Sequence, residues 1–234
     1  MKKILMFMAI MIAVVFSSAS FTSCSSDEER ETSFGFLKDT YMTIVGRSGR
    51  VSFVGDASSW NSSNNFVASV SSDGIITANH VGTCEITASS DRRSAKCTIN
   101  VEPIYDTYIE PLTIWGATRS EVKAYEKRQI VKEDERNIYF DGDGKYVTGL
   151  SYSFDNEGKL HTVMVLIKHD QKPSVAKELA EFFKERYRVI SVSASDSFFS
   201  NGNDKESSST FVDVRINQRG YEDYMFVYYT RYNF

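Results

Sequence analysis

The feature that most limits the folds open to this chain is a succession of short alternating segments over residues 36–101. In one of them Val51 and Phe53 fall on the same side of an extended backbone, and their neighbours fall on the other. Turn-forming residues such as Asp73-Gly74 separate the segments and favour tight reversals of the chain. Several short strands at this spacing predict an all-β sandwich.

The same segment resembles the bacterial immunoglobulin-like group 2 (BIG2) family. The pattern W-x-S-S…V-A-x-V-x-x-D-G-x-I-x-A…G-x-C-x-I-T-A…C-x-I-x-V carries the resemblance, beginning at Trp60 and ending at Val101. It implies an immunoglobulin-like sandwich over residues 36–102, with one edge strand reduced or missing. It also implies a spacer or adhesion unit at the cell envelope, without catalytic chemistry and without a cofactor.

The N-terminal residues predict export and lipid attachment. Two lysines precede an apolar run over residues 4–16, which has the length of a signal peptide. This run is shorter than the roughly 20 apolar residues of a membrane-spanning helix. The small residues before Cys24 resemble a bacterial lipobox, although Phe21 stands where Leu is usual. The resemblance implies that residues 1–23 are a lipoprotein signal peptide and that Cys24 is acylated; a cleaved signal peptide with a chance cysteine is the alternative.

An acidic and Ser-rich tether over residues 24–35 is expected to follow the cleavage site. Its acidic start resembles the surface-export signal of lipoproteins from Bacteroidota, which implies a protein anchored in the outer membrane and exposed at the cell surface. The alternative location is the periplasmic side of that membrane. Such a segment buries too little apolar surface to fold by itself, so it also suits a disordered tether.

The charge balance argues against a nucleic-acid partner. The chain carries a net charge of −4, and loss of the two signal-peptide lysines leaves −6. Nucleic-acid binding requires clustered Lys and Arg instead. The expected partners are therefore the membrane, through the lipid, and a glycan or a surface protein.

Cys84 and Cys97 are the cysteines that remain once Cys24 is assigned to lipid. A hairpin turning near residues 90–91 would pair residue 84 with residue 97 and place both sulfurs inward as cross-strand neighbours. Two interpretations stay open, namely buried free thiols that act as small apolar side chains and a disulfide, which an extracytoplasmic compartment permits. Neither implies catalysis, because no His or Asn is arranged to activate a thiolate.

Residues 103–234 predict an α+β domain. Ser120 followed by Glu121 indicates a helix start, and Pro173 opens an amphipathic helix. Three strand-like runs follow each helix, at residues 137–140, 145–154 and 160–168 and then 189–194, 210–217 and 224–231. This order predicts a helix-β-β-β pseudo-repeat, with two helices packed on an antiparallel sheet. In element order it resembles β-lactamase-inhibitor-protein-like domains, and residues 195–209 are expected to form a long loop.

No motif in this second domain predicts an enzyme or a metal site. Residues 141–144 (Asp-Gly-Asp-Gly) begin like a calcium loop, but an EF-hand needs Glu at its twelfth position, where this chain has Tyr152. A hairpin turn is expected there instead. His161 and His169 lie roughly 26 Å apart on one predicted strand, at about 3.3 Å per residue, and cannot share a metal. No pair of carboxylates stands out as a glycosidase acid and base.

The C-terminal strand supplies the candidate binding surface. Alternation places Tyr224, Phe226 and Tyr228 on one sheet face and Met225 and Val227 on the other. One face must pack on the helices. The other is either a second packed face or an aromatic platform for sugar or protein, because Tyr offers area and a hydroxyl.

These observations together predict a non-enzymatic surface lipoprotein for adhesion or recognition, with the BIG2 domain as spacer and the C-terminal domain as binding module. Two alternatives come from other classes. A structural component of the outer membrane predicts a large exposed apolar patch. An enzyme or an inhibitor-like module predicts a cleft with clustered groups of shifted pKa.

Overall fold

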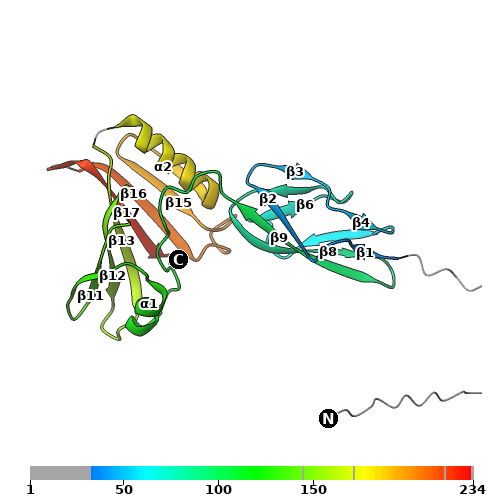
Figure 1. Ribbon diagram of the computed structural model, residues 1–234, viewed down its shortest axis with the longest axis horizontal. Coiled ribbons are helices and arrows are strands. Elements are labelled where there is room, and N and C mark those ends of the chain that lie inside the picture. The colour runs from blue at the N-terminus through cyan, green and yellow to red at the C-terminus, as the bar shows by residue number, and fades with distance from the viewer. Residues whose placement is uncertain (1–32, 144, 171, 219, 233–234) are drawn as a thin grey trace, which may run out of the picture. The chain divides into compact units, whose positions relative to one another are not determined.

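Figure 1 shows the computed structural model, which describes residues 33–143, 145–170, 172–218 and 220–232. The predicted signal peptide, Cys24 and most of the predicted tether lie outside the described residues. Strands make up 48% of the structure, and the described residues hold two helices. Ser33–Phe234 forms one compact unit. Within the described residues, no helix is both long enough and apolar enough to cross a membrane.

The N-terminal half of this unit is built only from strands. A four-stranded sheet has the order β2-β9-β8-β5, and a three-stranded sheet has the order β3-β7-β6. A short ribbon, β1 with β4, completes the set. The strand bounds are β1 Gly35–Phe36, β2 Thr40–Ile44, β3 Ser48–Gly49, β4 Phe53–Val54, β5 Ser59–Ser62, β6 Ala68–Val70, β7 Ile76–Ala78, β8 Gly82–Ser89 and β9 Ser94–Glu102.

The two sheets enclose a small apolar core to which β8 and β9 contribute every second residue. The buried members of this cluster are Val67, Ala68, Ile76, Ala78, Cys84, Ile86, Cys97, Ile99 and Val101. Trp60 packs against the cluster and fixes the turn before β7. Gly74 in that turn has a φ of 79°, and a Cβ there would lie 2.8 Å from the indole ring. Glycine at this position therefore meets both a conformational and a steric requirement.

The predicted pairing of residue 84 with residue 97 is wrong. In the structure Cys84 lies opposite Ile99, and Cys97 lies opposite Ile86. The reason is the turn: Ser89 pairs with Ser94, so the loop spans residues 90–93 and is centred one residue later than expected. A shift of one residue at the turn moves every cross-strand partner by two. The two thiols are free, buried and diagonal to one another on the inner face.

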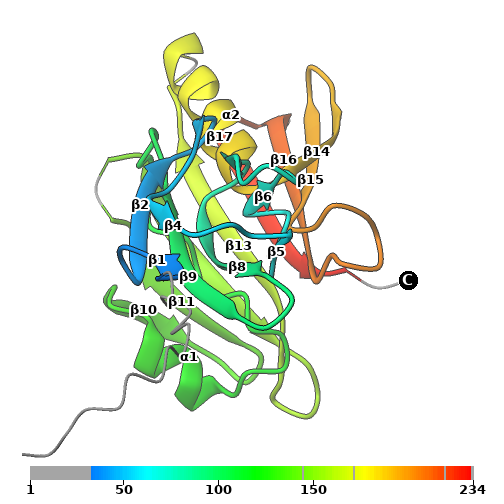
Figure 2. The same cartoon turned by 90° about the vertical axis from the view of Figure 1, so that its right-hand side faces the viewer.

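The C-terminal half contains one antiparallel sheet of eight strands, in the order β10-β11-β12-β13-β17-β16-β15-β14. Each helix precedes a meander of four strands, and the two meanders meet where β13 pairs with β17 (Figure 2). The bounds are α1 Arg119–Tyr125, β10 Ile130–Glu133, β11 Asn137–Asp141, β12 Val147–Phe154, β13 Leu160–Lys168, α2 Pro173–Arg186, β14 Arg188–Val192, β15 Asp196–Ser200, β16 Thr210–Gln218 and β17 Tyr221–Arg231.

This arrangement corrects the expected helix-β-β-β order, because each half has four strands rather than three. β15 lies inside the segment expected to be a loop, and β10 was not predicted at all. Both strands have weak signals in the sequence. β10 is four residues long and exposed throughout, so it shows no alternation, and β15 is a five-residue strand flanked by polar residues.

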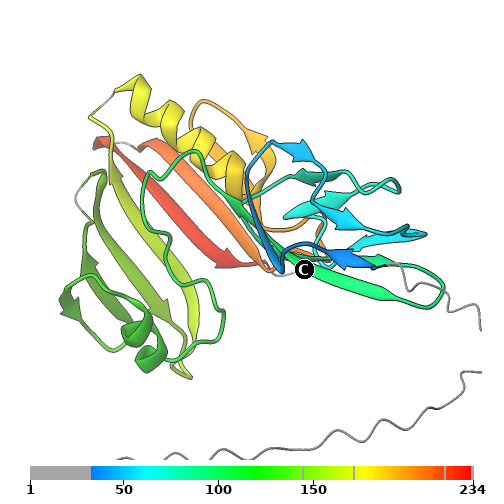
Figure 3. The ribbon, with the colours of Figure 1, turned by 45° about the vertical axis from the view of Figure 1, so that its right-hand side comes forward.

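Each helix begins at a residue type that favours a helix N-terminus, although only α1 has a side-chain cap. Thr118 caps α1 in a capping box with Glu121, so the helix begins at Arg119, directly before the predicted Ser-Glu start. Pro173 occupies the first turn of α2, where its missing N–H is tolerated. Both helices lie on the same side of the sheet (Figures 1 and 3), and their buried residues join a single core with the strands.

A connecting segment, residues 103–118, links the two halves and is fastened to α2 by a buried carboxylate. The backbone N–H groups of Ile104 and Tyr105 donate to Glu185, at 3.1 and 3.0 Å. The backbone carbonyl of Glu185 also accepts a hydrogen bond from the N–H of Val81, at 2.7 Å. One residue of α2 thus binds the sandwich and the connecting segment together.

Candidate functional site

The face of the eight-stranded sheet that the helices leave uncovered is the candidate site, and we call it the outer face. Burial along β17 alternates, with Met225, Val227 and Tyr229 in the core and Tyr224, Phe226 and Tyr228 half-buried on the outer face. Cross-strand register extends this face in two rows. One row is Tyr139, Ser151, Met164, Tyr228, Asp213 and Phe198, and the other is Leu166, Phe226, Arg215 and Asp196.

Aromatic side chains cluster around the middle of this face. The ring centroids of Phe226 and Tyr228 lie 6.4 Å apart with nearly parallel planes, 11° from one another. On the neighbouring strands, the rings of Phe198 and Phe211 lie 5.6 Å apart and are also stacked. None of these residues belongs to the helix-covered core. The face therefore presents aromatic carbon that no element of the described chain covers.

A charged pair lies among these rings. Arg215 donates from Nε and Nη2 to Oδ2 of Asp213, at 2.9 and 2.7 Å, and its guanidinium carbon is 5.0 Å from the ring centroid of Tyr228. Asp213 is only 8% exposed, and its Oδ1 is buried without a hydrogen-bond partner. A buried acceptor without a donor is unusual in folded proteins. It marks the pair as the polar centre of the outer face.

The sequence predicted Tyr224, Phe226 and Tyr228 as a candidate surface, and the structure places all three on the outer face. Their role in binding stays a prediction. Sequence reasoning missed Asp213 and Arg215, which come from β16 and reach Tyr228 only through the sheet register. A signal for them existed, because they alternate with the buried Val212 and Val214 of the same strand.

Two other side chains hold the C-terminal half together. Trp115 packs on the helix-covered core, and its Nε1 donates to Thr210 at 3.0 Å. Asp143, from the segment that begins like a calcium loop, accepts a hydrogen bond from Arg128 at 2.7 Å. Among the residues that the structure describes, no three His, Cys, Asp or Glu side chains gather as a metal site would require.

Three cavities of about 300, 380 and 340 Å³ lie away from the outer face. Two are in the sandwich. The remaining cavity, of about 380 Å³, lies at the start of α2 and is lined by Lys145, Lys168 and Lys172 among others. Its lysines are compensated, because Asp170 pairs with Lys168 and Lys172, and Glu178 pairs with Lys145. This cavity thus has little free positive charge to offer a ligand.

The two cysteines are poor nucleophiles. Burial raises the pKa of the Cys84 thiol. Burial, with added contributions from Cys84 and Glu85, raises the pKa of the Cys97 thiol to about 12. Because the thiolate is the reactive form, both side chains stay protonated and act as apolar core residues.

We expect Cys97 to lower the stability of the protein at alkaline pH. Its pKa is about 12 when folded and about 8.5 when unfolded, so its stabilising contribution is complete below pH 8.5 and is lost as the pH rises toward 12. The free energy of unfolding should fall by up to about 1.4 kcal/mol per pH unit for this thiol. Urea unfolding of wild type and Cys97→Ala at pH 8.5, 9.5 and 10.5 measures the difference. Parallel pH dependences of the two proteins would contradict the assignment.

The comparisons with known proteins agree with the fold of the N-terminal half. The structure is mostly β-sheet and includes an immunoglobulin-like domain. More particularly, residues 48–101 match the family model of the bacterial Ig-like domain (group 2), which confirms the predicted resemblance over strands β3 to β9. Domains of this family are generally non-catalytic. A search of curated proteins finds no significant match to the chain.

Proposed function

We propose that this protein is a non-enzymatic, lipid-anchored protein of the bacterial outer membrane, of the kind that Bacteroidota export to the cell surface, and that it acts in adhesion or recognition. The Ig-like domain, residues 36–102, serves as spacer. Residues 103–234 form an α+β domain that serves as binding module through its outer face. Two separate buried clusters, one in each of these ranges, support the division into two domains.

The observation that carries this proposal is the uncovered outer face. Tyr, Phe, Met and Arg side chains meet there, and these residue types are enriched where proteins bind partners. The rings of Phe226 and Tyr228 are half-buried, so they are held in place by their neighbours yet remain accessible. If the outer face served only as core, its side chains would be fully buried, as those on the helix-covered face are.

The burial pattern favours recognition over a scaffold function. A scaffold that packs against another envelope protein would present a large exposed apolar patch. The large apolar residues with the greatest exposure lie in the sandwich, in the connecting segment and on the edge strands β10 and β14, rather than in the two rows of the outer face; they include Leu37, Met42, Ile104, Ile109, Ile114, Val131 and Val192. The aromatic residues of the outer face are less exposed and are interrupted by the Asp213–Arg215 pair.

The proposed anchor is tested by the substitution Cys24→Ala in cells. We expect wild type to fractionate with the outer membrane and to be cleaved when protease is added to intact cells. The variant lacks the acylated thiol, so it should be released from the membrane. Cys97→Ala serves as the matched control and should leave fractionation unchanged. Wild-type protein that resists protease on intact cells would overturn surface exposure, and a variant that stays membrane-bound would overturn the lipid anchor.

A further inference from the structure

Resting on the proposed function, we propose that the centre of the outer face is a glycan subsite. Asp213 and Arg215 hold two adjacent hydroxyls of a pyranose, and the side chains of Phe226 and Tyr228 contact the apolar C–H surface of the same sugar ring. Nothing in the Ig-like domain takes part in this site.

Asp213 supplies an acceptor that the protein itself does not use. Both hydrogen bonds from Arg215 go to Oδ2, while Oδ1 has no partner. An unpaired buried acceptor costs about 1–3 kcal/mol in a folded protein. A ligand hydroxyl that donates a hydrogen bond to Oδ1 would remove this penalty, so the binding of a donor at this point is favoured.

Arg215 supplies a donor next to that acceptor. Its pair with Asp213 occupies Nε and Nη2, and a guanidinium has five N–H donors in a fixed fork. The side chain is 47% exposed, so it can shift to admit a ligand to the more deeply placed carboxylate. A hydroxyl both donates and accepts. Adjacent hydroxyls on a sugar ring therefore match a carboxylate and a guanidinium that lie side by side.

The aromatic rings beside the Asp213–Arg215 pair can contact the apolar C–H surface of a sugar. In register, Asp213 lies between Tyr228 and Phe198, and Arg215 lies opposite Phe226. Aromatic carbon removes the C–H surface of a bound pyranose from water, while the charged pair meets its hydroxyls. The two rows of the outer face run across neighbouring strands of the open sheet, along which a glycan chain can lie.

A protein partner fits these observations less well. A standard protein interface buries about 1,200–2,000 Å² and is depleted of Asp, Glu and Lys, although Arg is enriched there. Here a charged pair occupies the centre of the face, and its aspartate is almost fully buried. Covering the pair with apolar protein would leave Oδ1 without a donor. Sugar hydroxyls satisfy it.

The test uses the full-length acylated protein in detergent, applied to an array of defined hexose and N-acetylhexosamine oligosaccharides. Duplicate spots are oxidised with mild periodate and reduced with borohydride, which cleaves adjacent diols and leaves the rest of the glycan. We expect binding to a subset of untreated glycans and loss of binding to their oxidised duplicates. Binding to none of the glycans, or binding that survives oxidation, would overturn the proposal.

Variants then locate the site, with calorimetry on a disaccharide from the best array spot. Asp213→Asn keeps the side-chain size but removes the charge that pairs with Arg215, and we expect at least 10-fold weaker binding. The matched control is Asp73→Asn, which breaks the exposed ion pair with Arg50 in the Ig-like domain and should change affinity less than 2-fold. Circular dichroism verifies that both variants fold. Equal affinity of wild type and Asp213→Asn would place any glycan elsewhere and refute this subsite.

Different results would contradict the glycan subsite and the proposed function of surface recognition. If the outer face captures a purified envelope protein and Phe226→Ala abolishes that capture, while no glycan binds, the glycan subsite is wrong and recognition through the outer face stands. If wild type resists protease on intact cells, surface recognition fails whatever the array shows.

Discussion

Replacing Arg128 with methionine is expected to lower the free energy of unfolding by about 3–5 kcal/mol, because it leaves two buried carboxylates without their cation. The Arg128 side chain is 7% exposed, and those of its partners Glu126 and Asp143 are 3% and 13% exposed. Nη1 donates to Glu126 at 2.9 and 3.0 Å, and Nη2 donates to Asp143 at 2.7 Å. Equilibrium unfolding in urea measures the change.

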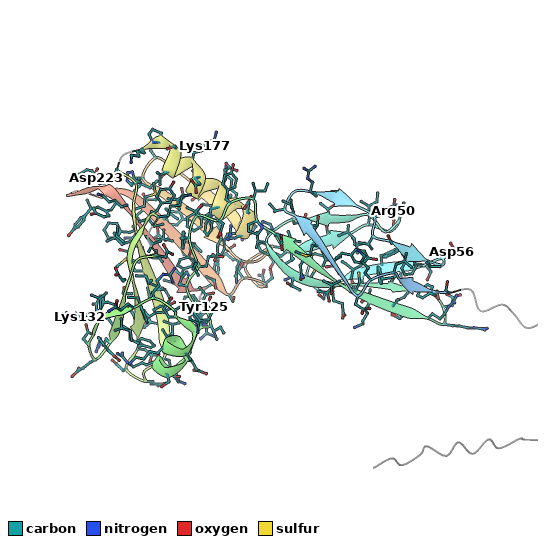
Figure 4. All side chains as sticks on the ribbon, in the orientation of Figure 1. Arg50, Asp56, Tyr125, Lys132, Lys177 and Asp223 are labelled. Carbon is teal, nitrogen blue, oxygen red and sulfur yellow. The ribbon has the colours of Figure 1, made fainter. Side chains whose placement is uncertain are left out.

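Two further variants distinguish the stability cost of losing a buried cation from the cost of losing an exposed one. Arg50→Met removes the ion pair between Arg50, which is labelled in Figure 4, and Asp73. Both side chains of this pair are more than half exposed, so the substitution should cost less than about 1 kcal/mol. Adding Glu126→Gln and Asp143→Asn to Arg128→Met should recover much of the lost stability, since no unpaired charge then remains. A loss as small for Arg128→Met as for Arg50→Met would show that the cluster is hydrated in solution.

Phe182→Ala should destabilise the protein by a similar amount, about 3–5 kcal/mol, through the cavity it leaves under α2. Phe182 has no exposed surface. Its ring stacks on Tyr108 with centroids 4.7 Å apart, and the guanidinium carbon of Arg186 lies 3.7 Å from the ring centroid. The ring thus joins the helix, the connecting segment and the sheet in one core. Thermal unfolding followed by circular dichroism measures the effect.

The matched control lies on the same helix. Lys177 is exposed on α2 and projects away from the sheet (Figure 4), so Lys177→Ala should alter stability by less than about 0.5 kcal/mol. If Phe182→Ala were as mild as this control, packing of α2 on the sheet would not be the source of stability in this half of the molecule.

Local patterns in the sequence predicted much of the fold. Most of what could not be predicted depends on the register between paired strands. The BIG2 pattern located the sandwich, and alternation in β17 separated Phe226 from Val227 correctly. The partners of Cys84 and Cys97 were misplaced because the turn between β8 and β9 is centred one residue later than expected. No local signal fixes such a choice between neighbouring loop residues.

The candidate site, too, could be predicted only in part from local sequence patterns. Its C-terminal aromatic residues were visible as one alternating run, whereas Asp213 and Phe198 join them only because β15 and β16 pair beside β17. β15 itself is too short and too polar at its ends to stand out from a loop. The unpaired oxygen of Asp213 depends on three-dimensional hydrogen bonding, and no sequence pattern contains it.

The meeting of the two meanders at β13 and β17 has a consequence for how this half of the chain folds. Every other pair of neighbouring strands in the sheet is consecutive along the chain, whereas β13 joins β17 across pairs such as Thr162 with Thr230. Local hairpins form within about 1–10 μs, but distant segments must first overcome the entropy of closing the intervening loop. We therefore expect each meander to assemble by itself and the pairing of β13 with β17 to set the folding rate of this half of the chain.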